Sequence, residues 1–126
     1  MKTNYKVAIA LVAGVAIGGA AIQGLHAQAK PPVFYVAEIN VTNIDAYTKE
    51  YATKAVALAK ASGAKFLAAG QNAVAFDGEA PSRVVVQQWE SMDKVKAWRN
   101  SPEYLENRKI GEKYAKFRAF AIEGVQ

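Results

Sequence analysis

Strand-forming segments alternate with helical ones along this chain, and their order limits the folds that it can adopt. The first segment, Phe34–Val41, is rich in aromatic and β-branched residues that alternate between two faces. Tyr35 and every second residue after it form an apolar face that should lie on the core. Phe34, Val36 and Glu38 belong to the opposite face. The pattern predicts a half-buried strand of a sheet.

The rest of the chain supplies two helical patterns and further strands. A helix is predicted from a capping segment at Thr42–Asp45 to Gly63, which suits a left-handed C-terminal position. A second helix starts after Ser91, restarts at Ser101–Pro102 and runs toward Tyr114. Further strands are predicted at Lys65–Gly70, Ala73–Phe76 (a brief return strand), Arg83–Trp89 and Lys116–Val125, with a loop at Asp77–Pro81.

This order, β-α-β-β-α-β, predicts an α+β fold of the ferredoxin-like kind, in which two helices cover one face of an antiparallel sheet. The other face is left bare, and it carries residues such as Phe34 and Val36. An exposed apolar sheet face is a liability for a single subunit. We therefore predict a homodimer in which two sheets meet face to face as a dimeric α+β barrel.

The N-terminus has the three parts of an export signal. A basic start is followed by an uncharged run from Val7 to Ile22 and by small residues at Ala27 and Ala29. The run is shorter than the ~20 residues that a spanning helix needs. We predict a cleavable signal peptide over residues 1–29, cut after Ala27 or Ala29, with retention as an anchor as the alternative. Cleavage would leave a single periplasmic or secreted domain at residues 30–126, without a stable membrane span.

Removal of that segment leaves a domain without histidine or cysteine, because His26 is the only histidine and the chain has no cysteine. Catalytic triads, cysteine nucleophiles, the usual zinc sites and iron–sulfur clusters are therefore excluded, and neither a metal nor a cofactor is expected. Acid–base work would fall to Asp, Glu, Lys or Tyr with shifted pKa values. The absence of disulfides from so small a domain also favours oligomerisation.

Three polar residues of the strands are candidate site residues. Glu38 points away from the helices, into the space between two paired sheets, where a raised pKa would suit a general base. The alternative is a carboxylate at the barrel mouth that is solvated or paired with a basic residue. Arg83 could bind an anionic ligand or pair with a loop acid such as Glu79. Gln88 could hydrogen-bond Glu38 if the strand register brings the two together.

Aromatic residues at strand and helix spacing have two interpretations. Trp98 and Tyr104, together with Trp89, could line a ligand pocket or belong to the core. The segment Asp93–Arg118 holds eight basic and four acidic residues, but cleavage of the signal leaves a net charge of only +3. A solvated helix face accounts for this segment, and no nucleic-acid partner is predicted.

Several short motifs together resemble the domain-of-unknown-function 1330 family. They are Tyr35–Ala37, Gly63–Leu67, Arg83–Val86, Ser91, Trp98, Asn100–Tyr104 and Ile122–Val125, of which Asn100–Tyr104 is the most specific. The resemblance covers nearly all of the chain after the signal and implies a dimeric α+β barrel. It departs from the family at Gln88, where members usually carry an acid, and at Ala69, where they often carry a basic residue.

Two functions are compatible with these features. The first is an exported dimer that binds a small, partly apolar molecule between the paired sheets. Its expected binding residues are Glu38, Arg83, Gln88, Trp98 and Tyr104. The second is a cofactor-free monooxygenase or isomerase acting on a small aromatic or carbonyl compound, with Glu38 as its base. Both kinds of enzyme occur in the superfamily that the resemblance implies, but a shared fold does not transfer an activity. The missing acid at Gln88 favours the first function.

Overall fold

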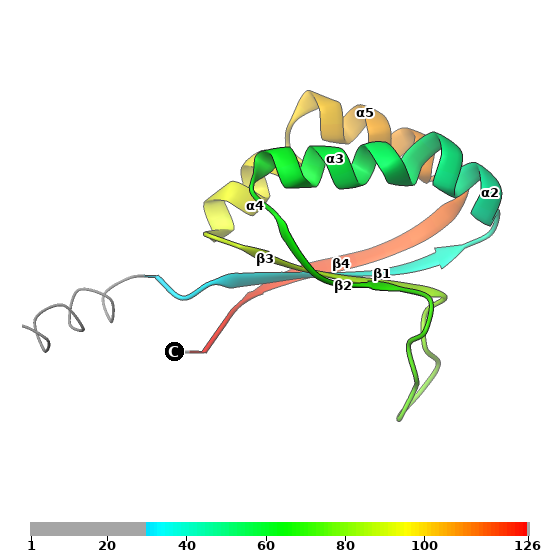
Figure 1. The fold of residues 1–126 in the computed structure, drawn as a ribbon, viewed down its shortest axis with the longest axis horizontal. Coiled ribbons are helices and arrows are strands. Elements are labelled where there is room, and N and C mark those ends of the chain that lie inside the picture. The colour runs from blue at the N-terminus through cyan, green and yellow to red at the C-terminus, as the bar shows by residue number, and fades with distance from the viewer. Residues whose placement is uncertain (1–29, 126) are drawn as a thin grey trace, which may run out of the picture. The chain divides into compact units, whose positions relative to one another are not determined.

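The structure is a computed structural model that describes residues 30–125. These residues form four strands and a layer of helices. The elements are β1 (Val33–Val41), α2 (Ile44–Ala46), the π-helical segment η1 (Tyr47–Ala52), α3 (Thr53–Ser62), β2 (Lys65–Gly70), β3 (Arg83–Trp89), α4 (Met92–Arg99), α5 (Pro102–Gly111) and β4 (Ala115–Glu123). All helices lie on one side of the sheet (Figure 1). The predicted ferredoxin-like α+β fold is confirmed, with the second helix divided into α4 and α5.

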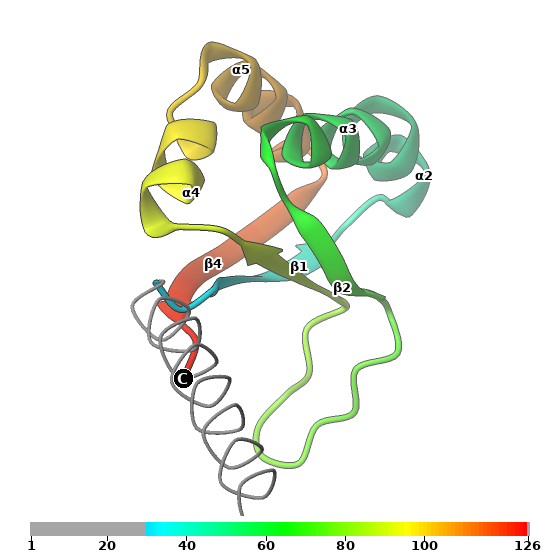
Figure 2. The same ribbon diagram turned by 60° about the vertical axis from the view of Figure 1, so that its left-hand side comes forward.

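β1 lies inside a four-stranded antiparallel sheet whose order is β2-β3-β1-β4 (Figure 2). The side chains of Val33, Tyr35 and Ile39 are buried on the face that the helices cover. The alternation predicted for this strand is therefore confirmed. Because β1 pairs on both sides, its register fixes which residues of β3 and β4 share each face.

The predicted helix starts are confirmed by their hydrogen bonds. Asn43 Oδ1 accepts from the Ala46 amide at 3.1 Å, and Ser91 Oγ accepts from the Lys94 amide at 3.2 Å. A third cap, at Ser101, precedes Pro102 at the start of α5. At the other end of α3, Gly63 has a φ of 116°, the left-handed conformation expected of it.

The sequence pattern did not reveal that Tyr47–Ala52 is π-helical. A π-helical turn places residues five apart in hydrogen-bonding register, so it shifts the side chains relative to an α-helix. Tyr47 and Tyr51 are both buried beneath this segment, whereas Ile44, which precedes it, is 44% exposed. Short π-helical turns are frequent at functional sites.

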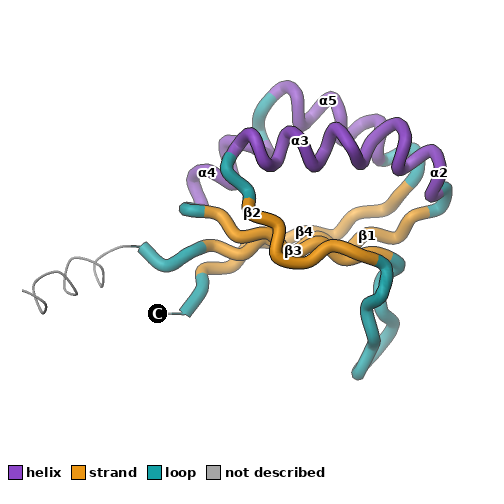
Figure 3. Tube along the Cα trace, viewed as in Figure 1, coloured by secondary structure: helices purple, strands orange, loops and turns teal. Residues whose placement is uncertain are grey.

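The predicted return strand at Ala73–Phe76 is wrong. β2 pairs directly with β3, and the pairing ends at Gly70 and Val84, so the intervening residues have no strand to join. Gln71–Ser82 instead forms a loop, here called the arm, which leaves the sheet on the side away from the helices (Figure 3). Ala73–Phe76 is solvent-exposed, and its backbone pairs with none of the four strands.

Two elements end at an earlier residue than predicted. α5 ends at Gly111 rather than near Tyr114, and β4 ends at Glu123 rather than Val125. The predicted signal peptide lies outside the described residues. Within residues 30–125, no helix combines the length and the apolar character required to cross a membrane.

Candidate functional site

A cavity of about 300 Å³ lies between the helices and the sheet of one subunit. This volume is at the lower end of the range of ~300–1,000 Å³ found for small-molecule sites. Its apolar lining includes Ala37, Ile39, Val56, Phe66, Val85 and Phe117. Its polar lining consists of Tyr35, Tyr47, Tyr51, Tyr104, Gln87, Lys60, Arg83 and Arg108. Among the described residues that line the cavity, none is an Asp or a Glu.

Two arginines donate hydrogen bonds to tyrosine hydroxyls in this cavity. Arg99 Nη1 donates to the Tyr35 hydroxyl at 2.5 Å, and Arg108 Nη1 donates to the Tyr104 hydroxyl at 3.0 Å. The Tyr104 hydroxyl lies close to that of Tyr35. Each tyrosine oxygen therefore accepts from a cation, which leaves the phenolic hydrogen free for another acceptor.

Three tyrosines of the cavity, Tyr35, Tyr47 and Tyr51, have raised pKa values and stay protonated at ordinary pH. Burial, followed by the nearby Tyr104 hydroxyl, raises the pKa of Tyr35 to about 12, although Arg99 opposes the shift. Burial also raises the pKa of Tyr51 and of Tyr47, the latter against the opposing charge of Arg83. These hydroxyls therefore act as hydrogen-bond donors rather than as bases.

Two further polar groups belong to residues that line the cavity. The buried Gln87 side chain accepts from Trp89 Nε1 through its Oε1 at 2.8 Å, so its amide nitrogen is the end left to donate. Trp98, which lines the cavity, has an indole N–H that is buried without a partner among the described residues. A buried donor without an acceptor is costly, and a bound molecule or a water would satisfy it.

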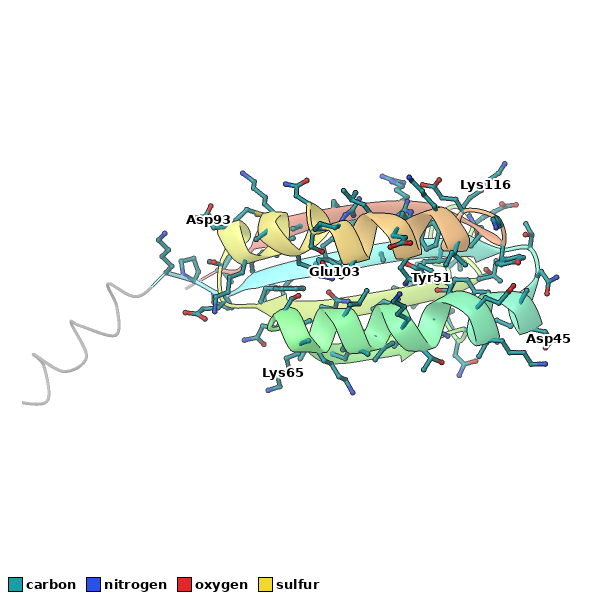
Figure 4. The ribbon with its side chains drawn as sticks, turned by 90° about the horizontal axis from the view of Figure 1, so that it is seen from above. Asp45, Tyr51, Lys65, Asp93, Glu103 and Lys116 are labelled. Atoms are coloured by element: carbon teal, nitrogen blue, oxygen red, sulfur yellow. The ribbon has the colours of Figure 1, made fainter. Side chains whose placement is uncertain are left out.

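Tyr51 is held in place by α5. Its backbone carbonyl accepts from Asn107 Nδ2 at 3.4 Å, and Asn107 is only 2% exposed. Its ring lies against Gly111 so closely that a β-carbon there would come within 2.6 Å of two ring carbons. In Figure 4, seen from the helix side, Tyr51 lies between the helical row of α3 and that of α5. The π-helical turn and the glycine together bring this ring into the cavity.

Aromatic rings give the cavity a rigid wall. The Trp98 ring centroid lies 5.1 Å from that of Tyr35, 4.9 Å from that of Trp89 and 4.8 Å from that of Tyr104. Trp98 and Tyr104 therefore belong both to the core and to the lining of the cavity, because both side chains are buried and both line it. The contacts with Tyr35 and Tyr104 are edge-to-face, and such contacts favour a fixed arrangement of the rings.

Of the three site residues predicted on the strands, Arg83 lines this cavity. It lies on the helix-facing side at the start of β3, close to Tyr47. Among the described residues, no ion pair joins it to Glu79. The structure thus directs its guanidinium toward the cavity rather than toward the loop acid.

Glu38 and Gln88 lie on the opposite face of the sheet. Glu38 points away from the helices, as predicted, but Val84 and not Gln88 is its partner on β3. Gln88 lies opposite Phe34, so the expected hydrogen bond between the two side chains does not form. Glu38 Oε2 lies 3.6 Å from Arg118 Nε, in a second hollow of about 290 Å³ that also includes Asn40, Lys116 and Glu79.

The sequence carries a signal for the helix-side cavity in its alanines. Five alanines line it where a larger side chain would fill the space: Ala37, Ala52, Ala55, Ala69 and Ala119. A sheet face that carries small residues beneath large tyrosines cannot pack solidly against its helices. Gln87 was not among the predicted site residues. Gln88, which was, lies one position along the same strand and therefore on the other face.

Three solved structures resemble this fold. The RPA0582 protein of Rhodopseudomonas palustris, of unknown function, has a TM-score of 0.64 at 14% identity, covering 84% of this chain and 90% of that one. SnoaB, a cofactor-independent oxygenase from Streptomyces nogalater, has a TM-score of 0.54 at 14% identity, with coverages of 76% and 95%. A candidate antibiotic biosynthesis monooxygenase from Caulobacter crescentus CB15 has 0.59 at 16% identity, with coverages of 77% and 92%.

At such identities the likeness establishes the fold alone, which is that of the ferredoxin-like α+β barrel proteins. Among proteins with curated descriptions, none matches the sequence. The model of the family described as a domain of unknown function, DUF1330, matches residues 32–125. That match includes every described strand and helix as well as the Asn100–Tyr104 motif. The chain therefore belongs to the DUF1330 family.

Proposed function

We propose that the domain binds a small, partly apolar molecule with an acidic oxygen, such as an aromatic carboxylate or a phenolate, in the cavity between helices and sheet. One observation carries this proposal. The polar groups of the cavity are hydrogen-bond donors or cations, and none of the described lining residues is acidic. This location replaces the space between two paired sheets as the binding site.

The charge of the lining selects for an anion. Arg83, Arg108 and Lys60 are cations, and the raised pKa values of Tyr35 and Tyr51 keep their hydroxyls protonated. A buried charge is stable only when it is paired and hydrogen-bonded. An anionic oxygen near the tyrosines would receive both kinds of support, whereas an amine would meet only like charges.

The rest of the cavity favours a flat apolar body. Phe66, Val85 and Phe117 contribute apolar surface, and the Trp98 cluster forms a stiff side wall. With a volume of about 300 Å³, the space suits a molecule of one or two fused rings. Burial of such rings would supply most of the binding free energy, and the donors would supply orientation.

The bare face of the sheet bears on how the subunits assemble. The bare sheet face carries Phe120 and Ile122, which are 46% and 61% exposed, next to the half-buried Phe34 and Val36. Pairing with a second copy would bury this apolar band, so we propose a face-to-face homodimer with one cavity in each subunit. We also propose that the domain acts in the periplasm or outside the cell, after cleavage of the N-terminal signal.

The test is calorimetric titration with 2-naphthoate and with its uncharged methyl ester. We expect the carboxylate to bind at least about tenfold more tightly, because a hydrogen bond to a charged group contributes about 1.5–3 kcal/mol. Tyr104→Phe and Arg108→Gln should each remove most of this preference. Equal affinity for acid and ester would refute the proposal.

Lys109→Gln is the matched control. Lys109 follows Arg108 on α5 but is exposed to solvent, so its replacement removes the same charge from the protein without changing the cavity. The preference for the acid should survive in this variant. If Lys109→Gln lowered the affinity as much as Arg108→Gln, net charge rather than the cavity would explain the binding.

A cofactor-independent oxygenase is the second candidate, because the fold resembles that of SnoaB and the donor-rich cavity would hold an ionised phenol. The described lining offers no carboxylate or imidazole as a base, so the substrate would have to enter already ionised. Dissolved oxygen would be the oxidant and the phenolate the reductant. Oxygen uptake with 2-naphthol above the protein-free rate, lost in Tyr104→Phe and kept in Glu38→Gln, would favour this candidate over simple binding.

A further inference from the structure

The arm, Gln71–Ser82, carries apolar side chains that a single subunit leaves in solvent. Phe76 is 93% exposed and Val74 is 75% exposed. The arm extends away from the helices, on the side of the sheet that no helix covers (Figures 1 and 2). Connections between adjacent antiparallel strands usually have about 2–5 residues, so the arm is longer than a hairpin requires.

The base of the arm is fastened to the end of β1. Ser82 Oγ accepts from the Val41 amide at 2.9 Å and donates to the Ile39 carbonyl at 3.0 Å. The Ser82 amide donates to Asn40 Oδ1 at 3.1 Å. Gly78 turns the arm with a φ of 71°, a conformation that L side chains rarely adopt. These features give the arm a defined direction, so its exposed phenylalanine is held outward rather than folded onto its own sheet.

The bare face of the sheet offers a surface that matches the arm. Its apolar band includes Phe120 and Ile122. The basic residues Lys116 and Arg118 lie near the N-terminal end of β4. The arm has the complementary order of side chains. Val74 and Phe76 are followed by the acidic residue Asp77, whereas Glu79 shares a hollow with Lys116 and Arg118 of its own subunit. Apolar contact and the charge of Asp77 therefore favour a bare face as the partner surface.

We propose that the arm of each subunit clasps the bare sheet face of a second copy of this chain. Phe76 and Val74 pack on the apolar band of that copy, and Asp77 lies toward its basic end. This inference rests on the homodimer of the proposed function and adds the element that holds it together. Because a two-fold dimer repeats every contact, each dimer has two such clasps.

The test measures the dimer dissociation constant of the full chain by sedimentation velocity. Phe76→Asp places a charge where the clasp buries a ring, and we expect it to weaken the dimer about 100-fold or more, since two arms are affected. Leu105→Asp is the matched control, because Leu105 is an exposed apolar residue on the helix layer. That variant should form dimers as the unmodified chain does.

Phe120→Asp separates failure of the clasp from failure of the dimer. If Phe120→Asp disrupts the dimer and Phe76→Asp does not, the face-to-face dimer stands and the clasp is overturned. If the unmodified chain is monomeric at micromolar concentration, both ideas are overturned. If Phe76→Asp and Phe120→Asp both dissociate the dimer while Leu105→Asp does not, the clasp is supported.

A thiol probe gives a second measurement that does not depend on a disruptive charge. The chain has no cysteine, so Phe76→Cys introduces a single thiol. In the clasp this thiol is covered, and we expect it to react with a thiol reagent at least about tenfold more slowly in the dimer than after dilution to monomer. Glu106→Cys, on the exposed side of α5, should react at one rate throughout. Equal rates for both thiols in the dimer would overturn the proposal.

Discussion

The contact between Gly111 and Tyr51 gives a sharp test of how the cavity is built. An alanine at position 111 would place its β-carbon 2.6 Å from Tyr51 Cδ1 and Cε1. Carbon atoms pack best at about 3.5–4.0 Å, so the ring would have to retreat by about 1 Å. Asn107 holds the Tyr51 backbone, and the rings of Tyr47 and Phe117 lie 5.2 and 5.4 Å away by centroid, which leaves the ring little room.

Two opposing effects set the size of the change. Overpacking a core typically costs about 1–3 kcal/mol. Alanine in place of glycine gains up to about 1 kcal/mol in a helix, and less at the last residue of α5, where Gly111 lies. We therefore expect Gly111→Ala to lower the free energy of unfolding by about 1–2 kcal/mol in urea titrations. Because the ring forms part of the cavity, the affinity for 2-naphthoate should fall as well.

Gly70→Ala is the control, since a β-carbon there meets nothing within 4 Å and the backbone has no positive φ. Its effect on unfolding should stay within about 0.5 kcal/mol. Combining Gly111→Ala with Tyr51→Ala, in an osmolyte that stabilises both backgrounds, removes the clash. In that background Gly111→Ala should be neutral or stabilising. The same loss with and without the Tyr51 ring would refute this account of the packing.

Three further predictions concern stability. The pKa of Tyr35 is about 12 in the folded chain against 10.0 for the ordinary group. Its contribution to the free energy of unfolding, about 2–3 kcal/mol, is therefore complete below pH 10 and is lost as the pH rises to about 12. Tyr35→Phe should flatten the pH dependence of unfolding in this interval. Asn43→Ala removes the cap of α2 and should cost about 1 kcal/mol in urea, whereas Asn43→Asp should cost little. Lys94→Ala breaks the exposed pair with Glu90 and should leave the urea midpoint of unfolding almost unchanged, with no difference at high salt.

Local pattern was sufficient to predict the strands and helices that form by pairing and capping. The alternation along Phe34–Val41, the cap at Ser101 and the left-handed Gly63 all act within a few residues, and each is found where expected. The return strand at Ala73–Phe76 failed because strand formation needs a paired backbone, and β2 pairs with β3 rather than with this segment. A stretch of apolar residues does not record whether a neighbouring backbone is free.

The site was harder to predict than the fold, because its key contacts join distant elements. Trp98, Tyr104 and Arg83 were identified as candidates, and all three line the cavity. The π-helical turn that exposes Tyr51 to this space, and the approach of that ring to Gly111, depend on how two helices meet above the sheet. Spacing within one helix carries no information about such a meeting.

The two faces of β1 divide the proposed functions between them. Tyr35 and Ala37 face the ligand cavity, whereas Phe34 and Val36 face the surface assigned to the second subunit. Since successive residues of a strand point to opposite sides, the two functions can be altered separately even though they share one backbone. Tyr104→Phe should therefore weaken the binding of 2-naphthoate in a dimer of normal strength, and Phe120→Asp should yield monomers that still prefer the acid to its ester. If the monomer lost that preference, the cavity would depend on the second subunit, and the separation by strand face would be wrong.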